Sequence, residues 1–174
     1  MKNQRGATLI ELAIFVAAAL VLLGIGLTAW ARVQDGTKST RLINMVSSID
    51  KAVHTRFPNT WNYAGLDVTS IADSLPGDIR PAGCAGKTCT ESIRSPFGGD
   101  IVVGPSFPGG TYAITIGPPL TTEGCIDLVT QLGTQFWYVQ RGTQMKAKSL
   151  AAIDPTIART ACANTTQSLR LTGT

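Results

Sequence analysis

Two patterns of apolar residues follow one another in the first third of the chain. Residues 7–30 (ATLIELAIFVAAALVLLGIGLTAW) are almost entirely apolar and contain one ionisable side chain, Glu11. A helix of that length would measure roughly 36 Å, which is enough to cross a hydrocarbon core of about 30 Å. Lys2 and Arg5 precede the segment, so the positive-inside bias predicts a cytoplasmic N-terminus and an extracytoplasmic C-terminal region.

From residue 31 to residue 56 the pattern becomes one-sided. Apolar residues recur mostly at intervals of three or four, the spacing of one face of an α-helix. This stripe consists of Val33, Thr40, Ile43, Val46, Ile49, Val53 and Phe57. We predict a single helix from residue 8 to about 56, ending before Pro58 because proline disfavours a helical conformation of the preceding residue. Its half 7–30 needs lipid or identical helices around it, and its half 31–56 needs a covering domain.

Residues 57–174 are rich in glycine and proline and are predicted to form that covering head. Runs of β-branched and aromatic residues predict strands at 101–103, 111–116, 135–139 and 168–171. Short helices are expected at 67–75, with Thr69 or Ser70 near its N-cap, and at 121–132, 147–153 and 155–163. Because neighbouring strands lack long helical crossovers, we expect an α+β fold whose antiparallel sheet packs on the stripe of the long helix.

Glu11 is the least expected residue of the apolar segment. An acid at membrane depth costs roughly 2.5 to 3.5 kcal/mol on insertion scales, and it is by default functional. A secretory signal peptide is disfavoured because the apolar run continues well beyond the usual 7 to 15 residues and contains an acid. A plain signal anchor accounts for the length and orientation of the segment but not for Glu11.

The segment Arg5–Leu12 (RGATLIEL) resembles the processing site of type IV prepilins, in which a basic leader ends in glycine and glutamate is the fifth residue after the cut. The resemblance implies that a prepilin peptidase removes leader residues 1–6 between Gly6 and Ala7 and methylates the new amine of Ala7. It also implies that Glu11 pairs with the terminal ammonium of a neighbouring subunit, a pairing that makes both buried charges tolerable. Ala7 departs from the phenylalanine usual in the type IVa subclass.

A second resemblance covers the head. Residues 95–103 (SPFGGDIVV), 112–116, 125–128 (CIDL), Cys162 and the last strand are similar to type IVb pilin heads, particularly thin-pilus pilins of conjugative plasmids and their enteric relatives. The expected fold is therefore the type IV pilin fold, with a long N-terminal helix packed against an antiparallel sheet and a disulfide-bonded C-terminal region.

Four cysteines, Cys84, Cys89, Cys125 and Cys162, lie on the translocated side. In an oxidising compartment they predict disulfides with three possible pairings, and their gaps do not match the paired spacing of a zinc site. We favour Cys125 with Cys162, which in the resembling pilins bracket the region facing outward on the fibre. The short spacing favours Cys84 with Cys89 as a local clasp.

Composition narrows the function further. The 174 residues suit one domain, and 44% hydrophobic with 15% charged residues excludes intrinsic disorder. The net charge of +4 includes the leader cations and indicates no specific nucleic acid partner. His54 is the single histidine, so a histidine metal cage or catalytic triad is disfavoured, and its spacing from Asp50 indicates a surface ion pair. No phosphate-binding glycine motif occurs. We expect no enzymatic activity, no cofactor and no metal.

The sequence therefore predicts the major structural subunit of an extracellular type IV pilus. The chain would rest in the inner membrane as a prepilin, meet the peptidase and the pilus assembly machinery, and then form a helical homopolymer. The sequence leaves open whether the fibre binds a receptor on a host or recipient cell, and whether it serves adhesion or conjugation. The alternatives are a minor or adhesive pilin and a type II secretion pseudopilin.

Overall fold

The computed structural model describes residues 9–58, 62–84, 89, 91–107, 110–141, 144–146 and 153–174. The chain divides into two compact units, Met1–Gly36 and Thr37–Thr174. Helix α1 (Leu9–Arg56) supplies all of the described part of the first unit and opens the second. Its end at Arg56 confirms the predicted single helix and its termination before Pro58.

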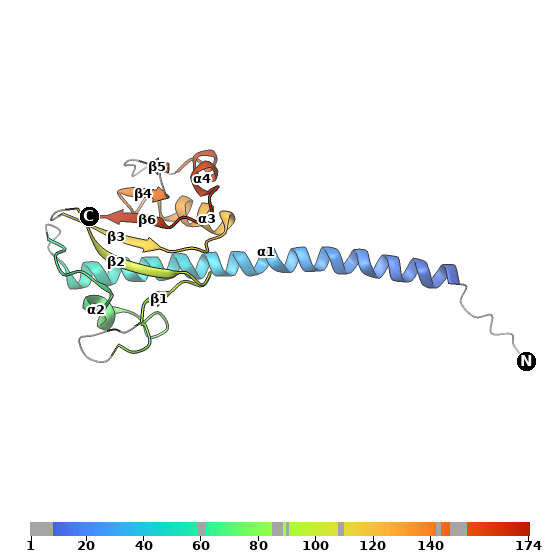
Figure 1. Ribbon diagram of the computed structural model, residues 1–174, viewed down its shortest axis with the longest axis horizontal. Helices are drawn as coiled ribbons and strands as arrows, with labels where there is room; N and C mark the ends of the chain where they lie inside the picture. Colours follow the sequence, from blue (N-terminus) through green and yellow to red (C-terminus); the bar gives the residue numbers. More distant parts are fainter. Residues whose placement is uncertain are drawn as a thin grey trace, which may run out of the picture. The chain divides into compact units, whose positions relative to one another are not determined.

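The second unit, which we call the head, contains one antiparallel sheet of six strands in the order β1-β2-β3-β6-β4-β5 (Figure 1). The strands are β1 (Ile93–Arg94), β2 (Asp100–Phe107), β3 (Thr111–Ile116), β4 (Tyr138–Arg141), β5 (Gln144–Lys146) and β6 (Leu169–Gly173). The C-terminal strand β6 pairs with both β3 and β4, so the last residues of the chain join the two halves of the sheet. The α+β class and the antiparallel sheet are thus confirmed.

Short helices connect these strands. Helix α2 (Val68–Ile71) continues into a 3₁₀ turn (Ala72–Ser74), and α3 (Thr122–Leu132) and α4 (Pro155–Cys162) lie side by side near β4 (Figure 1). The N-cap of α2 is Asp67, and Ser70, expected near the cap, lies at N3: the Ser70 amide donates to the Asp67 carboxylate, and Ser70 Oγ accepts from the Asp67 amide, which completes a capping box. The expected helix 147–153 falls largely outside the described residues.

The core of the head lies between the C-terminal part of α1 and the inner face of the sheet. Both contribute side chains to one buried cluster, and this confirms that the sheet packs on the helix. The buried face of the helix consists of Leu42, Met45, Val46, Ile49, Ala52 and Val53. The predicted stripe was wrong at its start, because Val33 and Thr40 are exposed while Leu42, which it omitted, is fully buried.

The β1–β2 hairpin turns through residues 95–99. The Ser95 amide donates to the Gly99 carbonyl at 2.8 Å, and Gly98 adopts a φ of +96°, which favours glycine. Gly99 approaches the next loop so closely that a Cβ there would lie 2.2 Å from the Gly117 carbonyl oxygen. These constraints fix the positions of the buried Ser95 and the half-buried Pro96, which line a pocket together with Arg41 and Met45 of α1.

Candidate functional site

The candidate assembly surface is the N-terminal part of α1. Every described side chain from residue 11 to residue 24 is exposed, and the large apolar ones are between 52% and 74% exposed. These large residues are Leu12, Ile14, Phe15, Val16, Leu20, Val21, Leu22 and Leu23. They occupy all sides of the helix, and a helix that is apolar all round requires an apolar environment. Glu11 lies in the first turn of α1.

Several predicted site residues lie outside the described part of the chain. Lys2, Arg5, Gly6 and Ala7 belong to residues 1–8, so the leader and its cleavage site keep the status of predictions. The predicted membrane segment 7–30 is described only in part, because residues 7 and 8 and the side chains of residues 9, 10 and 25–29 lie outside the described part. Within the residues that are described, we find no helix that is both long and apolar enough to cross a bilayer.

Two disulfides join the expected cysteine pairs. Cys125 in α3 is bonded to Cys162 at the end of α4, and both are fully buried. This bond fastens the two helices that lie side by side in Figure 1. Cys84 and Cys89 close a loop of sequence separation 5. The bond between α3 and α4 ties together segments separated by 37 residues and so restrains the C-terminal region of the head.

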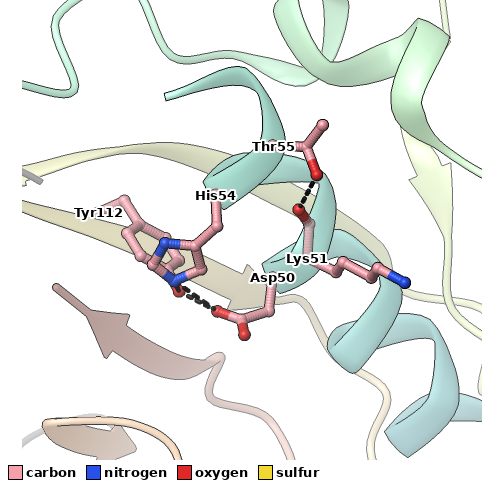
Figure 2. A network of polar contacts seen from close by, with 5 residues as sticks. All are labelled: Asp50, Lys51, His54, Thr55 and Tyr112. Atoms are coloured by element: carbon pink, nitrogen blue, oxygen red, sulfur yellow. Dashed lines mark hydrogen bonds and ion pairs between the residues drawn. The ribbon is translucent and has the colours of Figure 1, made fainter. Parts of the chain in front are cut away.

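A polar network connects α1 to β3 (Figure 2). The Tyr112 hydroxyl donates a hydrogen bond to the Asp50 carboxylate, and it lies 3.4 Å from His54 Nε2. His54 Nε2 lies 3.7 Å from Asp50 Oδ1. Asp50 and His54 therefore form the expected pair on one helix face, but the expectation of a surface ion pair was incomplete. Because Tyr112 is buried, the pair also anchors the helix to the sheet.

Burial favours the protonated form of Tyr112 and of its neighbour Tyr63. Desolvation raises the pKa of Tyr112 far above its usual range, and the hydrogen bond and negative charge of Asp50 add to the shift. Burial, with a smaller contribution from Asp50, also raises the pKa of Tyr63, whose ring centroid lies 5.0 Å from that of Tyr112. Both phenols stay protonated, and the Tyr112 hydroxyl is the one that donates to Asp50. The arrangement positions α1 and contains no activated nucleophile.

Sequence reasoning missed one buried cation. The side chain of Arg141 at the end of β4 is almost fully buried, and its Nη2 donates to the Leu120 carbonyl at 3.3 Å. Its Nε and Nη1 atoms make no hydrogen bond among the described residues. Burial lowers the pKa of Arg141. The alternation of β4, in which Val139 and Arg141 face inward, was the available signal.

The fold resembles that of a solved pilin. The chain aligns with TcpA, a type IV pilin from Vibrio cholerae El Tor biotype, with a TM-score of 0.53 and 20% identity, over 79% of this chain and 99% of that one. This likeness gives the chain the type IV pilin fold: a long N-terminal helix and an antiparallel sheet with a disulfide-bonded C-terminal region.

Sequence similarity extends over nearly the whole chain. It is 28% identical to the major structural subunit of bundle-forming pilus of Escherichia coli O127:H6 (strain E2348/69 / EPEC), covering 98% of this chain and 94% of that subunit. The same values hold for the subunit of Escherichia coli O111:H-. No family model matches the chain. The chain is thus similar to major pilus subunits over nearly its whole length and shares the fold of a type IV pilin.

Proposed function

We propose that this chain is the major subunit of an extracellular type IVb pilus and polymerises through the N-terminal part of α1. The observation that carries the proposal is the alignment with two major pilus subunits over 98% of the chain. The exposed apolar surface of residues 11–24 supports it, because that surface needs a cover that the described head residues do not supply.

In this proposal the exposed apolar surface of residues 11–24 is surrounded first by lipid and then by identical helices. In the inner membrane the segment 7–30 would lie in lipid, and in the fibre it would lie against the same segment of other copies. Lipid tails and apolar helices are similarly apolar, so association relies on close packing of small residues and on polar pairs. Ala17, Ala18, Ala19 and Gly24 offer such small positions. The exchange is then close to balanced, which suits assembly and disassembly by dedicated machinery.

Glu11 supplies the polar pair in this proposal. After a prepilin peptidase cuts between Gly6 and Ala7, the methylated amine of Ala7 in one subunit pairs with Glu11 of its neighbour. A carboxylate and an ammonium in an apolar bundle are costly apart and tolerable together, so the pair fixes the axial stagger of neighbouring helices. Activity of the chain as an enzyme has no part in this function.

The first test is the mature protein itself. Fibres sheared from cells at native expression should consist mostly of this chain, and intact-mass and N-terminal sequencing should give a methylated Ala7 as the first residue. A chain that begins at Met1, or one found only as a trace component of the fibres, contradicts the proposal.

The second test separates processing from assembly. Glu11→Gln should be cleaved at Gly6 normally, while fibre yield should fall about tenfold or more, since a loss of about 1.4 kcal/mol per contact changes an association constant tenfold. The matched control is Asp35→Asn, which removes the other acid from the N-terminal unit of α1 and should assemble normally. Equal yields from both variants would remove the role assigned to Glu11.

A further inference from the structure

The head contains a pocket that the assembly surface does not use. Its volume is about 380 Å³, at the small end of the range of ligand sites, about 300 to 1,000 Å³. Its walls come from α1, from the turn that follows α2, and from the β1–β2 hairpin. It therefore lies entirely within Thr37–Thr174.

The pocket has an apolar floor and a charged rim. Met45, Ile79 and Pro81 are buried at the bottom, together with Ser95, which is 5% exposed. The charged residues of the lining are exposed: Arg41, Arg80, Arg94, Asp78 and Glu91. The three guanidinium groups exceed the two carboxylates by one positive charge, so the lining favours an anion.

The three arginines keep hydrogen-bond donors for a ligand. Arg80 uses Nε to donate to the Ala72 carbonyl at 2.9 Å, and its Nη2 lies 3.7 Å from Asp73. Arg94 uses Nη1 toward Asp100 at 3.1 Å.

Arg41 makes no ion pair or hydrogen bond with any residue that the structure describes. Since a guanidinium group has five donors, each arginine retains several. Arg41 is thus the rim cation with the most unused capacity.

We propose that this pocket binds a small carboxylic acid that carries hydroxyl groups, the chemistry of an acidic monosaccharide. Its carboxylate pairs with Arg41 and one of the other two arginines, because guanidinium groups bind carboxylates through paired N–H donors. Its hydroxyl groups donate to Asp78 and Glu91, and its carbon skeleton contacts Met45 and Ile79. Phosphate has no carbon skeleton to contact Met45 and Ile79 and should therefore bind more weakly.

The test uses the full chain, isotope-labelled in nonionic detergent, with D-glucuronate as the probe. D-glucose, which lacks the carboxylate, and inorganic phosphate serve as comparison ligands. Glucuronate should give saturable amide shifts at Ile79 and Ser95, glucose should give none, and phosphate should bind more weakly. Arg41→Gln should weaken glucuronate binding about tenfold, the effect of losing a charge-assisted hydrogen bond. Arg94→Gln, on the wall formed by the β1–β2 hairpin, should also weaken binding.

The control is Lys51→Gln, which removes one exposed cation from α1 outside the pocket and should leave binding unchanged. Three outcomes would overturn the proposal. They are the absence of saturable shifts with glucuronate, equal shifts with glucose, and equal weakening by Lys51→Gln and Arg41→Gln. Tighter binding of phosphate than of glucuronate would overturn the assignment of ligand class.

Discussion

Removing the hydroxyl of Tyr112 should show how strongly the sheet of the head is anchored to α1. Tyr112 is 1% exposed and donates to Asp50, which also faces His54 (Figure 2). In Tyr112→Phe the ring stays in its packed position, and Asp50 loses a buried donor. Hydrogen bonds to charged groups are worth about 1.5 to 3 kcal/mol. Because the Asp50 side chain is 27% exposed and keeps His54 nearby, we expect a loss of about 1.5 kcal/mol at pH 7.

The same substitution should change the response of the head to alkali. The pKa of Tyr112 is raised in the folded state, so the stability that this shift contributes is complete below the unfolded pKa of about 10 and is lost above it. Between pH 10 and pH 11 the unfolded phenol ionises while the folded one does not. One such group then lowers the free energy of unfolding by about 1 kcal/mol over that interval. Tyr112→Phe should lose this part of the slope and keep the part contributed by Tyr63.

Urea unfolding of the full chain in nonionic detergent, followed by circular dichroism at pH 7, 10 and 11, measures both effects. The matched control is Tyr138→Phe, since the Tyr138 hydroxyl is buried and makes no hydrogen bond within the described part of the chain. Removing it should cost little or stabilise the head. A Tyr112→Phe variant as stable as wild type at pH 7, with an unchanged alkaline slope, would refute the anchoring role of the hydroxyl.

Three further variants test the disulfides and the buried arginine of the head. Replacing Cys125 and Cys162 together by serine should lower the free energy of unfolding by about 2 to 4 kcal/mol. Replacing Cys84 and Cys89 together by serine should lower it by less, because the loop that they close is shorter. Equal shifts in the urea midpoint of the two variants would contradict this order. Arg141→Met should be neutral or stabilising by about 1 to 4 kcal/mol in the same assay, because a buried cation with unpaired nitrogens is replaced by an apolar chain. A loss above 2 kcal/mol would mean that Arg141 stabilises the head through its bond to the Leu120 carbonyl.

Local signals in the sequence were enough for the longest elements. The helix was predicted at 8–56 and lies at Leu9–Arg56, and the strand predicted at 111–116 is β3. In both segments the hydrophobic pattern is uninterrupted and ends at residues that break regular structure: Pro58 after the helix, and glycines on either side of the strand. Strands β1 and β5 were missed because two or three residues are too few to display a period of two.

Contacts between segments that are distant in the sequence could not be predicted from it, for a different reason. The spacing of Asp50 and His54 was visible in the sequence, but their partner Tyr112 lies 62 residues beyond Asp50. Only the pairing of β3 with β2 and β6 and the packing of the sheet on α1 bring that hydroxyl to the helix. The burial of Arg141 likewise depends on the register of β4 against β6. Four cysteines allow three pairings; the resemblance to type IVb pilins favoured Cys125 with Cys162, and the short spacing favoured Cys84 with Cys89.

The stripe on α1 failed at its N-terminal end for an instructive reason. Thr40 and Val33 continue the spacing of three and four, yet the buried face begins near Ser39 and Leu42, close to the boundary of the head unit at Thr37. Periodicity gives the direction of a helix face but not the point at which the partner surface begins. N-terminal to that boundary the apolar residues lose their one-sided arrangement, and their partner is no longer in the described head. The same helix therefore has two kinds of part: its C-terminal part specifies contacts within the chain, and its N-terminal part, apolar all round, requires an apolar environment, which in the proposed function is lipid or other copies.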